Sequence, residues 1–269
     1  MSDSPPGLDA RDLLRAGFWR RLWSTFIDVI IIMLPFQMLA AGLFAITAGM
    51  IQMESGFFSS CADGKTIPQG LNPPPPHDSN FMRVCRVSMF GATTGATLTV
   101  GRVTREGGTT TTVSQSYMLD KEGAPIRGMS IDWIYQLALV AYLVAMVWKT
   151  GRTLGDRAAG IRVIDVTNPD AQGVPVGRVI GRYLAMMIGA IPLFALLIYQ
   201  YTATSGGADA MFTAQFFQWL TYAAVFGGVW ALLLITQIAL KIDPVYDRLA
   251  GTAVVKLLGT VHFPNPKRG

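Results

Sequence analysis

Long apolar runs alternate with charged segments along this chain. The run 22–53 contains a single charged residue, Asp28, the run 133–148 contains none, and the run 183–240 contains only Asp209. About 20 apolar residues in a helix are enough to cross the hydrocarbon core of a bilayer. A polar, glycine-containing turn around Asp209 divides the last run in two. We therefore predict four transmembrane helices, at 18–51, 131–149, 183–203 and 212–240.

The segment 52–130 between the first two helices has a different pattern. Its alternating polar and apolar residues predict strands over 83–90, 97–105 and 109–119, the last two joined by a glycine-rich turn at 106–108. The predicted fold is thus an all-α integral membrane protein. It has four transmembrane helices and a small β-rich insertion between the first and the second.

The two cysteines of the chain, Cys61 and Cys85, both lie in this insertion. In an oxidising compartment they are expected to form a disulfide, which would stabilise the insertion by about 3 kcal/mol through loop closure. The alternative is two free thiols that pack as small apolar side chains.

Fifteen of the 22 basic residues lie in or next to three segments of the predicted topology. These are the N-terminal segment 1–17, the connection 150–182 and the tail 241–269, whereas the turn 204–211 has none. The other seven lie in the insertion 52–130, and loops of that length translocate largely regardless of charge. Short loops rich in Lys and Arg face the cytoplasm. Both termini are therefore predicted to be cytoplasmic, and the insertion 52–130 to be extracytoplasmic.

The composition excludes several classes of function. The chain of 269 residues is 51% hydrophobic and 14% charged, with a mean hydropathy of +0.38 and 22 Lys+Arg against 17 Asp+Glu. Because these charges lie between apolar runs, their positive excess does not indicate nucleic-acid binding. Two cysteines and two histidines exclude a Cys/His zinc cluster, and no phosphate-binding loop, dinucleotide-binding motif or nucleophile elbow occurs. We expect no enzyme activity, cofactor or metal centre, and a lipid bilayer as the partner.

Asp28 is the candidate functional residue. A carboxylate within a membrane span costs a few kcal/mol unless it is paired, protonated or solvated. Helical spacing places it on one polar stripe with Arg21, Ser24 and Thr25, which opens at the cytoplasmic end of the first helix. Asp28 is then either a transport residue or part of a buried polar clamp between helices.

Three stretches resemble the RDD family of membrane proteins, which is named for one arginine and two aspartates. They are Gly17-Phe18-Trp19-Arg20-Arg21-Leu22 with Phe26-Ile27-Asp28, Thr153-Leu154-Gly155-Asp156-Arg157-Ala158-Ala159-Gly160-Ile161-Arg162-Val163, and Asp247-Arg248-Leu249-Ala250-Gly251-Thr252. The resemblance covers most of the chain outside 52–130, where a short connection is commoner in the family.

The resemblance implies Arg21, Asp28 and Asp247 as the motif residues, with the adjacent Arg20 competing for the arginine. Asp156 departs from the family, whose members often carry a basic residue there. The resemblance also implies a multi-pass protein of the bacterial inner (plasma) membrane with a role in transport, including sodium/proton exchange.

The second and third of these stretches also match each other. Asp156-Arg157 and Asp247-Arg248 open the two copies, and each copy follows a helix that returns to the cytoplasm. Arg21 and Arg178 each precede a proline by the same interval, an alignment that places Ala185 opposite Asp28. The chain is thus predicted to contain two parallel helix–helix–tail units, with one ion site per chain.

Asp247 follows Pro244, which ends the fourth helix by removing a backbone donor. Asp247 should therefore lie at the depth at which Arg21 enters the membrane. We predict that these two side chains lie within direct or one-water contact, with Asp28 two turns deeper in the membrane. The competing partner of Asp247 is its neighbour Arg248.

Two functions fit this pattern. The first is transport of a monovalent cation, a proton or a small solute, with Asp28 as the binding carboxylate, and four helices per chain suggest a homo-oligomer. The alternative is a non-transporting assembly or sensory module whose insertion 52–130 binds a membrane or extracytoplasmic protein.

Overall fold

The computed structural model describes residues 14–64, 66–106, 108–203 and 213–257. The chain divides into two compact units. The first combines the residues up to Asp28 with those from Ala141 onward, and the second is Val29–Val140. Strands make up 25% of the structure, so the all-α description is not confirmed.

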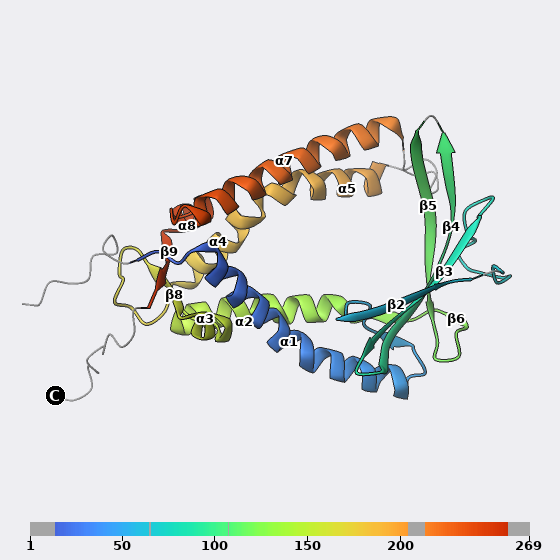
Figure 1. The fold of residues 1–269 in the computed structure, drawn as a ribbon, viewed down its shortest axis with the longest axis horizontal. Coiled ribbons are helices and arrows are strands. Elements are labelled where there is room, and N and C mark those ends of the chain that lie inside the picture. Colours follow the sequence, from blue (N-terminus) through green and yellow to red (C-terminus); the bar gives the residue numbers. More distant parts are fainter. Residues whose placement is uncertain (1–13, 65, 107, 204–212, 258–269) are drawn as a thin grey trace, which may run out of the picture. The chain divides into compact units, whose positions relative to one another are not determined.

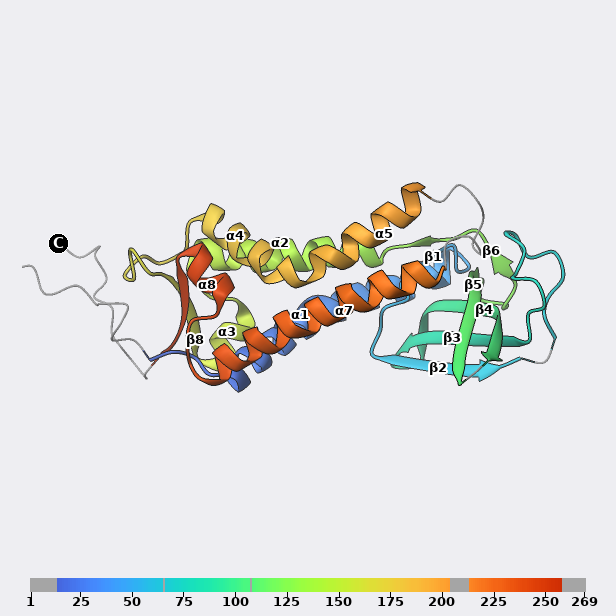
Figure 2. The same cartoon turned by 90° about the horizontal axis from the view of Figure 1, so that it is seen from above.

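Four helical stretches are long and apolar enough to cross a membrane, as the apolar runs predict. They are α1 (Phe18–Ile46), α2 (Asp132–Thr150), α4 (Val176–Met186) continued through η1 (Met187–Ala190) into α5 (Ile191–Ala203), and α7 (Ala214–Ala239). Within the first unit, α5 and α7 lie side by side (Figures 1 and 2). The predicted turn 204–211 lies outside the described residues.

Two helix boundaries differ from the predicted ones by five residues or more. The third apolar helix begins at Val176 rather than 183, because acidic partners neutralise Arg178 and Arg182 within it. The first ends at Ile46 rather than 51, because the backbone enters the left-handed region at Ala48 and Gly49.

The first unit also contains a strand pair that the sequence analysis does not predict. The short helices α3 (Leu154–Ala159) and α8 (Val245–Ala250) lead into β8 (Ile161–Asp165) and β9 (Thr252–Lys256), which pair antiparallel. Gly160 and Gly251 end the two helices with φ of 64° and 65°, which favours glycine. The core beneath the strands is aliphatic: Val147, Ile161, Val163, Val174, Val179 and Val254.

The second unit holds a five-stranded antiparallel sheet in the order β2-β3-β4-β5-β6. The strands are β2 (Phe58–Asp63), β3 (Phe81–Met89), β4 (Ala92–Glu106), β5 (Thr109–Leu119) and β6 (Pro125–Ile126), and a separate parallel pair joins β1 (Ile51–Gln52) to β7 (Met129–Ser130). The three predicted strands correspond to β3, β4 and β5. Within the predicted turn 106–108, residue 107 lies outside the described residues.

The predicted disulfide is confirmed. Cys61 on β2 and Cys85 on β3 are direct partners in the strand register and are joined by a disulfide. Leu98, Val100, Tyr117 and Leu119 form the core of the sheet together with Phe44 of α1. The sheet therefore has a hydrophobic core, and the end of α1 contributes Phe44 to it.

Candidate functional site

Asp28 is surrounded by hydrogen-bond donors within the first unit. Its side chain is buried, with the residue only 2% exposed. Oδ1 accepts hydrogen bonds from the Tyr142 hydroxyl and the Gly155 amide, both at 2.8 Å, and Oδ2 accepts one from the Thr153 hydroxyl at 2.6 Å. Three donors thus stabilise the carboxylate without a positively charged partner.

A second buried carboxylate, Asp156, is linked to Asp28 through Thr153. The Ser24 hydroxyl donates to Asp156 Oδ1 at 2.6 Å, and the Thr153 amide donates to Oδ2 at 3.1 Å. The Thr153 hydroxyl that donates to Asp28 also accepts from the Asp156 amide. In the part of the chain that the structure describes, neither Asp28 nor Asp156 forms an ion pair.

The local sequence explains this geometry. Thr153 and Asp156 form a reciprocal capping box at the start of α3. A Cβ on Gly155 would lie 2.0 Å from the Ser24 carbonyl oxygen and 2.8 Å from the Asp28 carboxylate. Glycine is therefore required for α3 to approach α1 closely enough to donate to Asp28.

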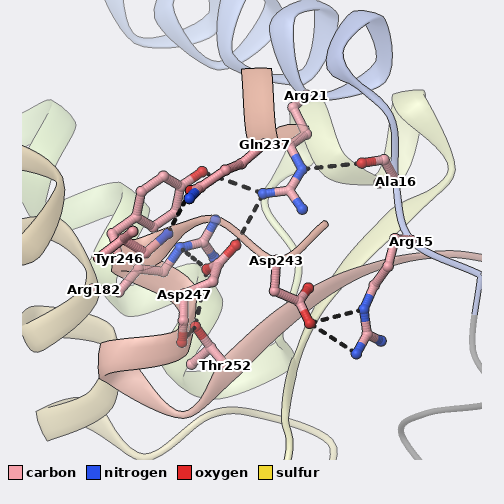
Figure 3. Close-up of polar contacts among 10 residues, drawn as sticks. Arg15, Ala16, Arg21, Arg182, Gln237, Asp243, Tyr246, Asp247 and Thr252 are labelled. Atoms are coloured by element: carbon pink, nitrogen blue, oxygen red, sulfur yellow. Dashed lines mark hydrogen bonds and ion pairs between the residues drawn. The ribbon is translucent and has the colours of Figure 1, made fainter. Parts of the chain in front are cut away.

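Asp247 forms a different kind of site (Figure 3). It is 0% exposed, and its two oxygens lie 2.9 Å from Arg21 Nη1 and 3.0 Å from Arg182 Nε. The Thr252 hydroxyl donates to it at 3.0 Å, and the guanidinium of Arg182 stacks over the Tyr246 ring. This carboxylate is compensated by two cations, as a buried charge requires.

The structure separates the two candidate arginines. Arg21 makes the predicted contact with Asp247, whereas Arg20 donates to the Ala159 carbonyl at 2.7 Å. Arg248, the predicted competitor for Asp247, is exposed.

The other supporting residues take minor roles. The Thr25 hydroxyl donates to the backbone carbonyl of Arg21, and the Arg157 side chain is exposed. Ser24 and Asp156, by contrast, belong to the Asp28 cluster.

Sequence reasoning missed three residues of these sites: Tyr142, Thr153 and Arg182. The Thr-x-x-Asp spacing of Thr153 and Asp156 was a readable helix-start signal. Arg182 was counted only as a basic loop residue. No local signal distinguishes Tyr142 from the other aromatic residues of its apolar run.

Arg152 and Arg162, in the segment that follows α2, each have another arginine as a neighbour. Burial, and then the charge of Arg157, lowers the pKa of Arg152, and burial, and then Arg152, lowers the pKa of Arg162. Arg162 donates to the Gln172 carbonyl at 2.7 Å. Asp156 of the Asp28 cluster interacts electrostatically with Arg152 but forms no ion pair with it in the described part of the chain.

The internal repeat is visible as symmetry in the strand pair. Aligning Asp156 with Asp247 also aligns Val163 with Val254, and these two valines are partners in β8–β9. The same alignment exchanges the two strand pairs that flank these valines, which is the result expected for a two-fold axis between β8 and β9. The helix–short helix–strand units are therefore related by a local pseudo-two-fold axis.

Side-chain contacts extend this symmetry to the longer helices. Ser24 of α1 contacts Oδ1 of Asp156, and Arg182 of α4 contacts Oδ1 of Asp247. Arg20 and Arg178 lie at the equivalent glycines Gly160 and Gly251, so Ser24 and Arg182, each four residues further along, correspond in the two halves.

This correspondence corrects the alignment drawn from the sequence. Asp28 corresponds to Met186 rather than Ala185, and Arg20 rather than its neighbour corresponds to Arg178. Matching the two arginine–proline intervals gives an alignment that is shifted by one residue, because equal spacing does not show which residues make equivalent contacts. Asp28 still has no acidic counterpart in the second half.

The Asp28 cluster offers oxygen atoms only: two carboxylates and the hydroxyls of Ser24, Thr153 and Tyr142. Oxygen is the ligand type that hard cations prefer. Among the described residues there is no group of three or more His, Cys, Asp or Glu side chains that suits a metal ion.

The four apolar helices indicate a multi-pass membrane protein, and Asp28 is a buried carboxylate within one of them. No protein-family model matches this chain, and neither a search of curated proteins nor one of solved structures found a match.

Proposed function

We propose that this protein moves a monovalent cation or a proton across a membrane, and that Asp28 is the carboxylate that binds it. The observation that carries the proposal is the absence of an ion pair on Asp28 and Asp156 within the described residues. Two buried carboxylates linked by one threonine need a proton or a cation to offset their charge.

The proposed exchange follows from competition between a proton and a cation for the same cluster of oxygen atoms. Binding of a proton neutralises Asp28, and binding of a cation favours its ionised form. Thr153 donates to both carboxylates, through its hydroxyl to Asp28 and through its amide to Asp156, so a change of charge on Asp28 acts on a residue that also binds Asp156. Exchange of a cation for a proton at this cluster is the simplest reaction that these groups support.

The proposed orientation has both termini in the cytoplasm and the insertion 52–130 outside. It is supported by the arginines around the α2–α3 connection and the start of α4. The proposal also includes membership of the RDD family, which rests on the motif residues Arg21, Asp28 and Asp247. Function as a homo-oligomer would supply the further helices that enclose a pathway.

The test uses the purified full chain in liposomes with a pH-sensitive dye inside. A sodium or potassium gradient should drive a change of internal pH with the unaltered protein. Asp28→Asn should abolish it, whereas the matched control Asp63→Asn, which removes an exposed carboxylate from the insertion, should not. Equal rates with Asp28→Asn would overturn the role of Asp28.

The second candidate is a non-transporting assembly or sensory module. It is favoured by the edge strand β2, because all six of its residues are exposed and an open strand edge can pair with another chain. No pH change with the unaltered protein under either gradient would contradict transport and favour this function.

A further inference from the structure

Three exposed phenylalanines gather at one end of the second unit. Phe57, Phe58 and Phe90 are 42%, 61% and 87% exposed. Phe58 is the first residue of β2 and Phe57 directly precedes it, and Phe58 pairs with Ser88, near the end of β3. Phe90 occupies the turn that joins β3 to β4. The three side chains therefore share one end of the sheet, which we call the phenylalanine tip.

The turn itself is conformationally unfavourable for a phenylalanine. Met89 pairs with Ala92, so Phe90 and Gly91 form a two-residue hairpin loop with φ of 48° and 85°. Such a loop favours Asn-Gly, and a bulky residue with positive φ is uncommon. A strained aromatic residue that makes little contact with its own chain points to a contact outside the chain.

The depth of the tip follows from its neighbours on the helices. The amides of Glu54 and Ser55 donate to the carboxylate of Asp132, the first residue of α2, both at 2.9 Å. With 19 residues, α2 is about 28 Å long, close to the thickness of the hydrocarbon core. A helix this short can span the membrane only if Asp132 lies at its boundary. Ser55 therefore lies at that boundary as well.

Contacts with α1 give the direction in which the sheet extends. Gln37 donates to the Ser55 carbonyl, and Val87 lies against Gly56. Phe44, two turns further along α1, packs in the same core as Leu98 of β4. Leu98 of β4 thus lies near the end of α1. The first residues of β4, and the turn before them, lie on the side of Leu98 that faces the membrane.

We propose that the phenylalanine tip lies in the interfacial layer of the same bilayer, on the side of the insertion. The occupant of this apolar surface is phospholipid, because the tip lies at the depth of Ser55 and Asp132. Phenylalanine is among the apolar side chains by which interfacial segments enter the boundary between lipid headgroups and acyl chains. The sheet is then held against the membrane at one end, which limits its motion relative to the ends of α1 and α2.

The test compares spin labels at three positions of the full, oxidised chain in phospholipid vesicles. The substitutions are Phe90→Cys at the tip, Thr111→Cys near the opposite end of the sheet, and Val225→Cys in the middle of α7. One label per chain shows that the Cys61–Cys85 disulfide is still formed. Collision with oxygen, which concentrates in lipid, is compared with collision with a water-soluble nickel chelate.

The label at 90 should be more accessible to oxygen than to nickel, and the label at 111 should show the reverse. The label at 225 tests independently whether the helices lie in lipid. A label at 90 that is as accessible to nickel as that at 111 overturns the proposal, even where 225 reports lipid. Low accessibility to both reagents at 90 also overturns it, because the tip would then contact protein. Phe57→Cys repeats the test without altering the turn, and the same two results would decide it.

Discussion

Asp28 and Asp247 are both removed from solvent, but the charges around them differ. Asp247 lies between two guanidinium groups, those of Arg21 and Arg182. Asp28 accepts hydrogen bonds from two hydroxyls and one amide and has no ion pair within the described structure. The two halves of an approximately symmetric structure therefore hold their buried acids in opposite electrostatic states.

This difference separates the structural role proposed for Asp247 from the binding role proposed for Asp28. A buried acid with two cations is neutralised permanently, and removing one partner leaves a costly unpaired charge. A buried acid with only neutral donors can be neutralised by a mobile proton or cation. Ser24, which donates to Asp156, corresponds to Arg182, which pairs with Asp247, so a neutral hydroxyl in one half takes the place of a cation in the other.

The largest expected effect is the loss of charge at Asp247. Asp247→Asn leaves Arg21 and Arg182 buried without a carboxylate and should lower the free energy of unfolding by about 3–5 kcal/mol. Denaturant unfolding of the purified protein in detergent measures it. An Arg21→Ala/Asp247→Ala double-mutant cycle should show clear coupling. A cost of less than about 1 kcal/mol would mean that the cluster behaves as an exposed surface pair.

Removal of the disulfide should affect the second unit alone. Cys61→Ser with Cys85→Ser opens a loop with a sequence separation of 24 and should destabilise the sheet by about 3 kcal/mol. Limited proteolysis should then cut within 52–130 at lower denaturant concentration. Cation-driven flux should not change, and a loss of flux would show that the insertion takes part in transport. Reduction of the unaltered protein provides the control.

Asp28→Asn sharpens the comparison because it makes the same chemical change as Asp247→Asn. No cation loses its partner, and the remaining amide oxygen still accepts a hydrogen bond, so the cost should be about 1 kcal/mol. The measurement is the same denaturant unfolding. A loss as large as that of Asp247→Asn would show that Asp28 has a cationic partner and would erase the difference between the halves.

The smallest effect is expected at an exposed pair on the sheet. The Arg83 guanidinium, 2.8 Å from the Asp63 carboxylate, lowers the pKa of Asp63. Its stabilisation is therefore present above the ordinary aspartate pKa and is lost as the pH falls through the lowered value. Asp63→Asn should reduce the melting temperature slightly at neutral pH and not at all in acid or high salt. A pH-independent decrease would exclude this electrostatic origin.

Much of the architecture is readable from the sequence because membrane spans depend on local composition. The four apolar stretches, the disulfide and the Arg21–Asp247 contact were predicted from runs, spacing and depth. The strands β8 and β9 were not, because each has only five residues and is buried by partners distant in sequence. The pocket around Asp28 was hidden for the same reason, since Tyr142 and Thr153 reach it only through tertiary packing.

Infrared difference spectroscopy tests the central claim most directly, because it detects the protonation of a single buried carboxyl group. Spectra are recorded for the reconstituted protein with and without sodium, beside those of Asp28→Asn. We predict that a band of protonated carboxyl in the sodium-free protein is lost when sodium is added, and that Asp28→Asn lacks this change. A spectrum that sodium does not alter, or one that changes equally in Asp28→Asn, would contradict the assignment of Asp28 as the cation- and proton-binding residue.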